Sequence, residues 1–299
     1  MIDLQKNPRH IPVLLKEITD LCLDSKMHLD CNLGDAGHVE ALLKANPKVH
    51  VHAIDADAEA VHRAEYFLQK NTKRVTFHKG NFSELEHLVG SVGKFDTVLF
   101  DLGLSTYQLG ESQRGFSFKY DEPLDMRFST DPVDEKTGEL TAYDIVNSWS
   151  PDNIALILRN YADEPSAWKI AKAIEAARED GEIKTSKQLA DIIESVVKRR
   201  GGIHPATKTF QAMRIAVNGE LQALESALNQ TQQILASKGK IIVISYHSLE
   251  DRIVKNMFKK FEEEGKGVRM NKKVILPTDE EIEKNPRSRS AKLRIYTQI

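Results

Sequence analysis

One stretch, residues 27–43 (MHLDCNLGDAGHVEALL), constrains the fold of this chain more than any other. Residues 27–31 suit a short buried strand, a loop with Gly34 and Gly37 follows, and apolar residues at helical spacing come next. Glycines let such a loop turn sharply and approach a ligand closely. The amides of the loop and of the helix start favour an anionic group. The stretch therefore predicts the strand, loop and helix that bind nucleotides and other adenosine ligands.

A carboxylate at the end of the next predicted strand supports a ligand site. Residues 49–54 form that strand, and Asp55 follows it about twenty residues after the glycine loop. An acidic residue at this distance can accept hydrogen bonds from two ribose hydroxyls. The spacing Gly34-x-x-Gly37 lacks the third glycine of the dinucleotide fingerprint, so a plain turn stays the alternative for the loop alone.

Strands and helices alternate through the first hundred residues. The predicted strands are 27–31, 49–54, 74–78 and 95–100, with helical segments between them. This order predicts an α/β fold with a doubly wound, mostly parallel sheet that binds ligands at the carboxyl ends of its strands. Four side chains follow the four strands and should share that edge: Asp30, Asp55, Phe82 and Asp101.

The alternation stops at about residue 107 and returns near residue 210. Between these points the pattern predicts helices at 151–161, 165–178 and 186–199, the last with Ser186 as N-cap, and no comparable strand. We therefore expect a discontinuous domain, 1–106 and 210–299, with an inserted helical domain at 107–209. The remaining predicted elements belong to the discontinuous domain. They are a first helix at 10–22 with Pro12 in its first turn, a long helix at 206–236, and strands at 240–245, 268–276 and 292–298.

Composition limits the class of protein. The 299 residues contain 40% hydrophobic residues and carry a net charge of −2, so global charge does not indicate nucleic-acid binding. Two basic segments, 186–214 and 285–295, nevertheless favour RNA contact. No apolar run reaches membrane-spanning length, and the N-terminus lacks a signal-peptide pattern, so we expect a cytoplasmic protein.

The residues after the glycine loop discriminate between adenosine ligands. A nicotinamide dehydrogenase needs a third glycine beside the pyrophosphate, whereas Val39 and Glu40 occupy this region. A ligand with adenosine but no phosphates fits better, and S-adenosylmethionine is the common one. Its carboxylate would lie on the loop amides, its ribose on Asp55 and its adenine against Phe82.

Sequence blocks along nearly the whole chain resemble one family, the 16S rRNA cytosine-N4 methyltransferases, also called MraW or RsmH. The blocks are HIPVLL at 10–15, DCNLGDAGH at 30–38, GNF at 80–82, DLG at 101–103 with Gln108, RGFSF at 114–118, PLDMR at 123–127, HPAT at 204–207, TFQA at 209–212, SYHSLEDRIV at 245–254 and residues 285–293. The chain departs from the family pattern at Asn32, at Asp35 and at Tyr246, which replaces phenylalanine.

The resemblance implies an enzyme that methylates N4 of cytidine 1402 in the decoding centre of the small ribosomal subunit. Its donor is S-adenosylmethionine and its partner is 16S rRNA, with no metal and no membrane. A homodimer is among the oligomeric states left open. The cofactor contacts carried over are Ala36, Gly37, His38, Asp55, Phe82, Asp101 and Gln108.

The predicted chemistry centres on Asp101. The lone pair of an exocyclic amine is delocalised into its ring, and an oxygen that accepts the amine N–H would localise it. Asp101 lies at the required strand end, so we expect it to be catalytic. Its run continues Leu-Gly-Leu without an aromatic residue, so Tyr107, Phe116 or Phe118 would have to clamp the base.

Several residues keep two interpretations. His247 and Asp251 have the helical spacing of a metal pair, but no third ligand is evident, and a hydrogen-bonded helix cap is the favoured interpretation of His247. Arg114, Asp125 and Arg127 either line an RNA cleft or tie down the long loop at 110–126. A non-catalytic RNA-binding homologue is the last alternative, which the presence of Asp55 and Asp101 disfavours.

Overall fold

The computed structural model describes residues 11–129, 139–199, 202 and 204–299. Their contacts define two compact units. The first comprises Met1–Gly103 and Leu221–Ile299, and the second comprises Leu104–Glu220.

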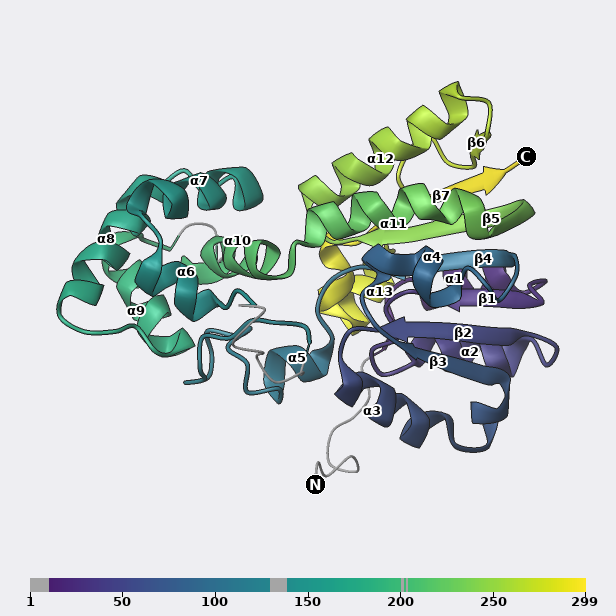
Figure 1. Ribbon diagram of the computed structural model, residues 1–299, viewed down its shortest axis with the longest axis horizontal. Coiled ribbons are helices and arrows are strands. Elements are labelled where there is room, and N and C mark those ends of the chain that lie inside the picture. Colours follow the sequence, from purple (N-terminus) through teal and green to yellow (C-terminus); the bar gives the residue numbers. More distant parts are fainter. Residues whose placement is uncertain (1–10, 130–138, 200–201, 203) are drawn as a thin grey trace. The chain divides into compact units, whose positions relative to one another are not determined.

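The first unit is built on one sheet of seven strands among the described residues, in the order β3-β2-β1-β4-β5-β7-β6 (Figure 1). Strands β1 to β5 are parallel, and β7 is antiparallel to both β5 and β6. This confirms the predicted doubly wound, mostly parallel α/β sheet. The strands are β1 Met27–Asp30, β2 His50–Asp55, β3 Val75–Lys79, β4 Phe95–Asp101, β5 Leu235–Ser245, β6 Gly267–Arg269 and β7 Lys292–Gln298.

Helices cover both faces of this sheet, and β4 explains why. Leu99 packs in an apolar cluster with α1, α2 and α3, while Val98 and Phe100 pack in a second cluster with α4, α11 and α12. A strand that is buried on both faces has a nearly continuous apolar sequence, and the sequence of β4 is of this kind. The helices are α1 Leu15–Cys22, α2 Gly37–Ala45, α3 Ala58–Leu68, α4 Leu85–Val89, α11 Glu220–Ile234, α12 Ser248–Glu263 and α13 Asp279–Lys284, with short 3₁₀ turns η1 Gln69–Arg74, η2 Phe82–Glu84 and η3 Pro286–Ser290.

The second unit is helical and has its own apolar core. Ile145, Leu158, Ile174 and Met213, from four different helices, are fully buried in it. Its helices are α5 Thr106–Gly110, α6 Ala142–Ser148, α7 Pro151–Ala162, α8 Ala167–Glu179, α9 Ser186–Val196 and α10 Ala206–Asn218. Because α10 packs in this core, the second unit extends to Glu220, whereas the sequence predicted an end at residue 209. The unit begins at Leu104, compared with the predicted residue 107.

Backbone conformation explains where predicted elements were wrong. The first helix begins at Leu15, since Leu14 has φ 53°, and Pro12 therefore lies outside it. The long helix predicted at 206–236 is two helices, because Gly219 has φ 58° in the left-handed region. Thr185, not Ser186, caps α9 by accepting from the amide of Gln188.

Other elements also differ from prediction. The strand predicted at 268–276 extends only over Gly267–Arg269, and β5 begins at Leu235 instead of residue 240. The short helices α5, α6 and α13 were not predicted. None of the helices in the described ranges is long and apolar enough to cross a bilayer.

Candidate active site

The loop between β1 and α2 is held by hydrogen bonds at both ends. The amide of Leu33 donates to the carbonyl of Ile54 at 3.1 Å, and the amide of Ala36 donates to that of Leu33 at 2.8 Å. Ala36 is the N-cap of α2 with φ 57°, and alanine offers no side-chain acceptor for the first amides of the helix. These amides can therefore bind a carboxylate.

Gly37 is required here by packing within the chain. A Cβ at this position would lie 2.4 Å from Cγ of Pro12. The segment that carries Pro12 is held by two long-range hydrogen bonds: Asn285 Nδ2 donates to the carbonyl of Ile11 at 2.9 Å, and the amide of Leu14 donates to Glu281 Oε1 at 2.7 Å. The sequence predicted that this glycine lets a ligand approach, whereas the close neighbour of Gly37 in the structure is Pro12 of the same chain.

Asp35, which departs from the family pattern, has a partner of its own. Arg63 of α3 is buried and donates from Nε to Asp35 Oδ1 at 2.9 Å. A charge-assisted bond of this kind offsets the negative charge beside a site for an anionic group.

Asp55 has the geometry of a ribose acceptor. Its Oδ2 accepts from the amide of Gly34 and its Oδ1 from the amide of Asp57, both at 2.9 Å. Each carboxylate oxygen has a second lone pair that remains available to a hydroxyl. Burial raises the pKa of Asp55 to about 6, so the group is mostly ionised at pH 7.

Phe82 stands at the same sheet edge, in η2 after β3. Its ring packs edge-to-face on Phe100 at 5.8 Å between centroids and is half-buried, which leaves part of the ring for stacking. With the amides of α2 and the free lone pairs of Asp55, the donors and acceptors of this edge fit S-adenosylmethionine.

Asp101 ends β4 between two polar side chains. Tyr246 donates from its hydroxyl to Asp101 Oδ1 at 2.8 Å, and His38 Nε2 lies 3.4 Å from Asp101 Oδ2. His38 is 8% exposed, and neither ring nitrogen has a hydrogen-bond partner among the described residues. Sequence reasoning noted Tyr246 only as a departure from the family pattern and assigned it no role.

The remaining candidates belong to the helical unit. Gln108 is buried, and its Oε1 accepts from the amide of Ser105 at 2.9 Å in a capping box that starts α5. The three proposed aromatic clamps pack inside this unit: Tyr107 is 7% exposed, Phe116 stacks on Phe128, and Phe118 stacks on His204.

His247 serves as a helix cap. Its Nδ1 accepts from the amide of Glu250 at 3.4 Å, and Glu250 Oε2 accepts from the amides of Tyr246 and His247 at 2.8 and 3.2 Å. Asp251 instead accepts from Arg294 at 2.7 and 3.2 Å. The helical spacing of His247 and Asp251 therefore reflects two separate structural contacts.

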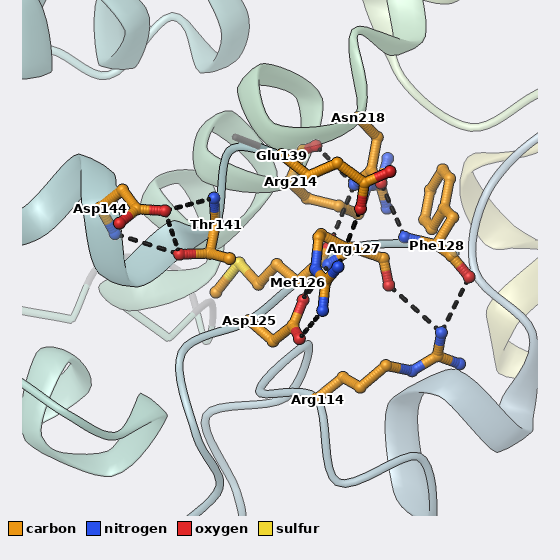
Figure 2. Close-up of polar contacts among 10 residues, drawn as sticks. All are labelled: Arg114, Asp125, Met126, Arg127, Phe128, Glu139, Thr141, Asp144, Arg214 and Asn218. Carbon is orange, nitrogen blue, oxygen red and sulfur yellow. Dashed lines mark hydrogen bonds and ion pairs between the residues drawn. The ribbon is translucent and has the colours of Figure 1, made fainter. Parts of the chain in front are cut away.

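The loop after Arg114 is tied down by its own charged residues (Figure 2). Arg127 donates two bonds of 2.8 Å to the carboxylate of Asp125, and Arg114 donates to the carbonyls of Arg127 and Phe128 at 3.2 and 2.8 Å. Hydrogen bonding to Asp125 raises the pKa of Arg127. The sequence left open whether these residues line an RNA cleft or hold the long loop in place, and the contacts in the structure are of the second kind.

The family model for the MraW methylase family matches residues 7–299. The chain belongs to this family. A ribosomal RNA small subunit methyltransferase H of Coprothermobacter proteolyticus is 44% identical over 293 residues, covering 96% of this chain and 95% of the relative. One of Sulfurihydrogenibium sp. is 42% identical over 297 residues, covering 97% and 99%.

Solved structures are more distant from this MraW family member. An rRNA methylase from Streptococcus thermophilus is 8% identical with a TM-score of 0.43, and the match covers 95% of this chain and 93% of that one, which is too remote to inform the site. Family membership confirms the resemblance drawn from the sequence blocks, and with it a methyltransferase that uses S-adenosylmethionine. Membership of a methylase family rules out the alternative of a nicotinamide dehydrogenase.

Proposed function

We propose that this methylase transfers a methyl group to the exocyclic N4 of cytidine 1402 in 16S rRNA, at the decoding centre of the small ribosomal subunit, in the cytoplasm. The names of its relatives, which specify small-subunit rRNA, support the substrate class. The family resemblance supports the nucleotide and the atom.

The observation that carries this proposal is the carboxylate of Asp101 at the carboxyl edge of the sheet. S-adenosylmethionine, when bound, supplies an electrophilic methyl group on a sulfonium. The chain then needs only to orient the amine and to localise its lone pair, which is positioning and electrostatic catalysis. A carboxylate oxygen accepting the amine N–H performs both tasks and takes the proton that the methylated amine releases.

The cofactor contacts follow from the same edge. The amides of Gly37 and His38 would bind the carboxylate of the donor beside Ala36, Asp55 would bind its ribose hydroxyls, and Phe82 would pack on its adenine. The charge of Asp101 would also attract the positive sulfur of the donor. Gln108 is a further proposed contact.

Basic residues of the first unit offer an RNA surface at this edge. Lys292, the first residue of β7, pairs with Ser245, the last residue of β5. The 3₁₀ turn η3 immediately precedes β7, so its exposed Arg287 and Arg289 lie near the carboxyl ends of the parallel strands. Arg294 does not contribute, because it is buried against Asp251.

Several basic residues of the helical unit form ion pairs within the chain, so fewer of them are available to contact RNA than the sequence suggests. Arg214 donates two bonds to Glu220 at 2.6 and 2.8 Å, and Lys187 pairs with Asp191. Lys198 and Arg199 are exposed, and Arg199 lies 3.5 Å from Glu194. Arg200 lies outside the described residues.

Methylation with labelled donor tests the proposal. The enzyme is incubated with methyl-labelled S-adenosylmethionine and deproteinised small subunits, and the RNA is digested to nucleosides. We expect label in N4-methylcytidine, and its loss when cytidine 1402 is replaced by uridine. Label in another nucleoside, or retained after that replacement, contradicts the assignment, and an unlabelled RNA supports the non-catalytic alternative.

A further inference from the structure

Asp101 is held from one side by a tyrosine that the proposed chemistry has not used. The Tyr246 hydroxyl donates to Oδ1 at 2.8 Å. This is a charge-assisted hydrogen bond, stronger than one between neutral groups. Burial and the charge of Asp101 raise the pKa of Tyr246 well above its usual value, so the hydroxyl stays a donor at any working pH.

The tyrosine is itself fixed in place. It directly follows β5, whose Ile244 pairs with Asp101 in the parallel register. Glu250 accepts from the backbone amide of Tyr246 at 2.8 Å, which anchors the main chain. Against the ring lies Gly103, with φ 115°, where a Cβ would come within 3.1 Å of Tyr246 Cδ2. Both the backbone and the ring of Tyr246 are therefore constrained.

The second oxygen of Asp101 is in a different situation. Oδ2 lies 3.4 Å from His38 Nε2, and this nitrogen has no hydrogen-bond partner among the described residues. Since Oδ1 is occupied by Tyr246, Oδ2 is the oxygen that remains available to a substrate N–H.

We propose that Tyr246 is a positioning residue for methyl transfer: it holds Asp101 Oδ1 so that Oδ2 faces the acceptor amine. This inference rests on the proposed function, because it assumes that Asp101 receives the amine N–H. Tyr246 acts through Asp101 and does not touch the reacting atoms. Without its hydroxyl the Asp101 side chain can rotate, and a smaller fraction of enzyme holds the productive geometry.

Tyr246→Phe removes a single oxygen and tests the proposal by single-turnover methylation at saturating S-adenosylmethionine. We expect the rate to fall roughly 10-fold, the scale of one lost hydrogen bond to a charged group, with little change in donor affinity by calorimetry. The matched control is Tyr296→Phe, since Tyr296 is fully buried in the same sheet and its hydroxyl has no hydrogen-bond partner within the described ranges. This control should keep the wild-type rate.

A double-mutant cycle separates positioning from independent effects. In an Asp101→Ala background, Tyr246→Phe should cause no further loss, because the group it positions is absent. An equal loss in both backgrounds, or a wild-type rate for Tyr246→Phe while Asp101→Ala is slow, overturns the inference and leaves the proposed function standing. A wild-type rate for Asp101→Ala overturns the inference together with the catalytic role of Asp101, whereas a wild-type enzyme that does not methylate the RNA overturns the proposed function itself.

Discussion

At the scale of single residues, Asp55 has a structural role that the sequence did not predict, in addition to its proposed contact with a ribose. Its position after β2 predicted a ribose contact. The structure adds that the same carboxylate joins the glycine loop to the start of α3, through the amides of Gly34 and Asp57. The loop geometry and the proposed ribose contact therefore depend on one side chain.

Replacing Asp55 with alanine should weaken S-adenosylmethionine binding by roughly 2–4 kcal/mol, the range for losing charged hydrogen bonds at a partly buried site. Calorimetry measures this directly. Asp96→Ala is the matched control, because Asp96 also accepts from two backbone amides, those of Lys26 and Met27, but at the start of β1 and β4. Equal losses of affinity in the two variants would reduce Asp55 to a structural role.

Asp30 should make stability depend on pH. Burial raises its pKa from 3.8 to about 6, so the folded state binds a proton more tightly than the unfolded state. Folding therefore loses stability as pH rises from about 4 to above 6. Asp30→Asn lacks this titration and keeps an acceptor for the amide of Asn32. In urea unfolding, the free energy of unfolding of the variant relative to that of wild type should rise by about 2–3 kcal/mol between pH 4 and pH 8. If this difference between variant and wild type stayed constant with pH, the raised pKa of Asp30 would be contradicted.

The site residues show what a sequence can and cannot reveal at this scale. Asp55, Phe82 and Asp101 follow predicted strands, so parallel topology alone places them at one edge. Tyr246 follows a strand as well, but it is 145 positions from Asp101 in the sequence. The two residues come into contact only because β5 lies beside β4, and the sequence pattern does not give this order of strands. The approach of Pro12 to Gly37 is equally invisible, since the pattern predicted a helix there.

At the scale of elements, strands were easier to predict than the ends of helices. Buried parallel strands such as β4 carry a continuous apolar signal. The break between α10 and α11 depends on one left-handed glycine, Gly219, within an otherwise continuous helical pattern. Likewise, the start of α1 depends on the φ of Leu14, which apolar periodicity does not encode.

The long loop of the helical unit depends on Asn218 at the end of α10. Its Nδ2 donates to the carbonyl of Met126 at 2.8 Å, and its Oδ1 accepts from the amide of Phe128 at 2.7 Å (Figure 2). Asn218→Ala leaves both backbone groups without this partner, so the free energy of unfolding should fall by about 1–3 kcal/mol.

Asn229→Ala provides the comparison for this loop. Asn229 is exposed, and its side chain donates to the carbonyl of Glu225 within α11. Thermal and urea unfolding should show little change for this variant. A similar stability for the two variants would mean that the loop does not depend on the amide of Asn218.

At the scale of the whole molecule, a net charge of −2 hides local basic surfaces. Replacing both Arg287 and Arg289 with glutamate should weaken rRNA binding. The negative slope of log affinity against log salt should become less steep by roughly 1–2, because about two phosphate contacts are lost. Filter binding across a salt series measures both quantities, and cofactor affinity should stay unchanged.

The control for this charge reversal is Lys259→Glu with Lys260→Glu. Both lysines are exposed near the end of α12, which starts beside the carboxyl edge of the sheet and runs away from it, and the change in net charge is the same. If both double variants alter the salt slope equally, long-range charge, and not a phosphate contact at η3, explains the effect.

Asp101 allows the most direct test of the proposed chemistry. Single-turnover methylation of 16S rRNA is measured at saturating S-adenosylmethionine for wild type, Asp101→Asn and Asp101→Ala. Asparagine keeps an acceptor oxygen without the charge, and alanine loses both. We predict a rate about 10² or more below wild type for alanine and an intermediate rate for asparagine. A wild-type rate for Asp101→Ala at saturation would contradict the catalytic role and leave Asp101 as a cofactor-binding residue.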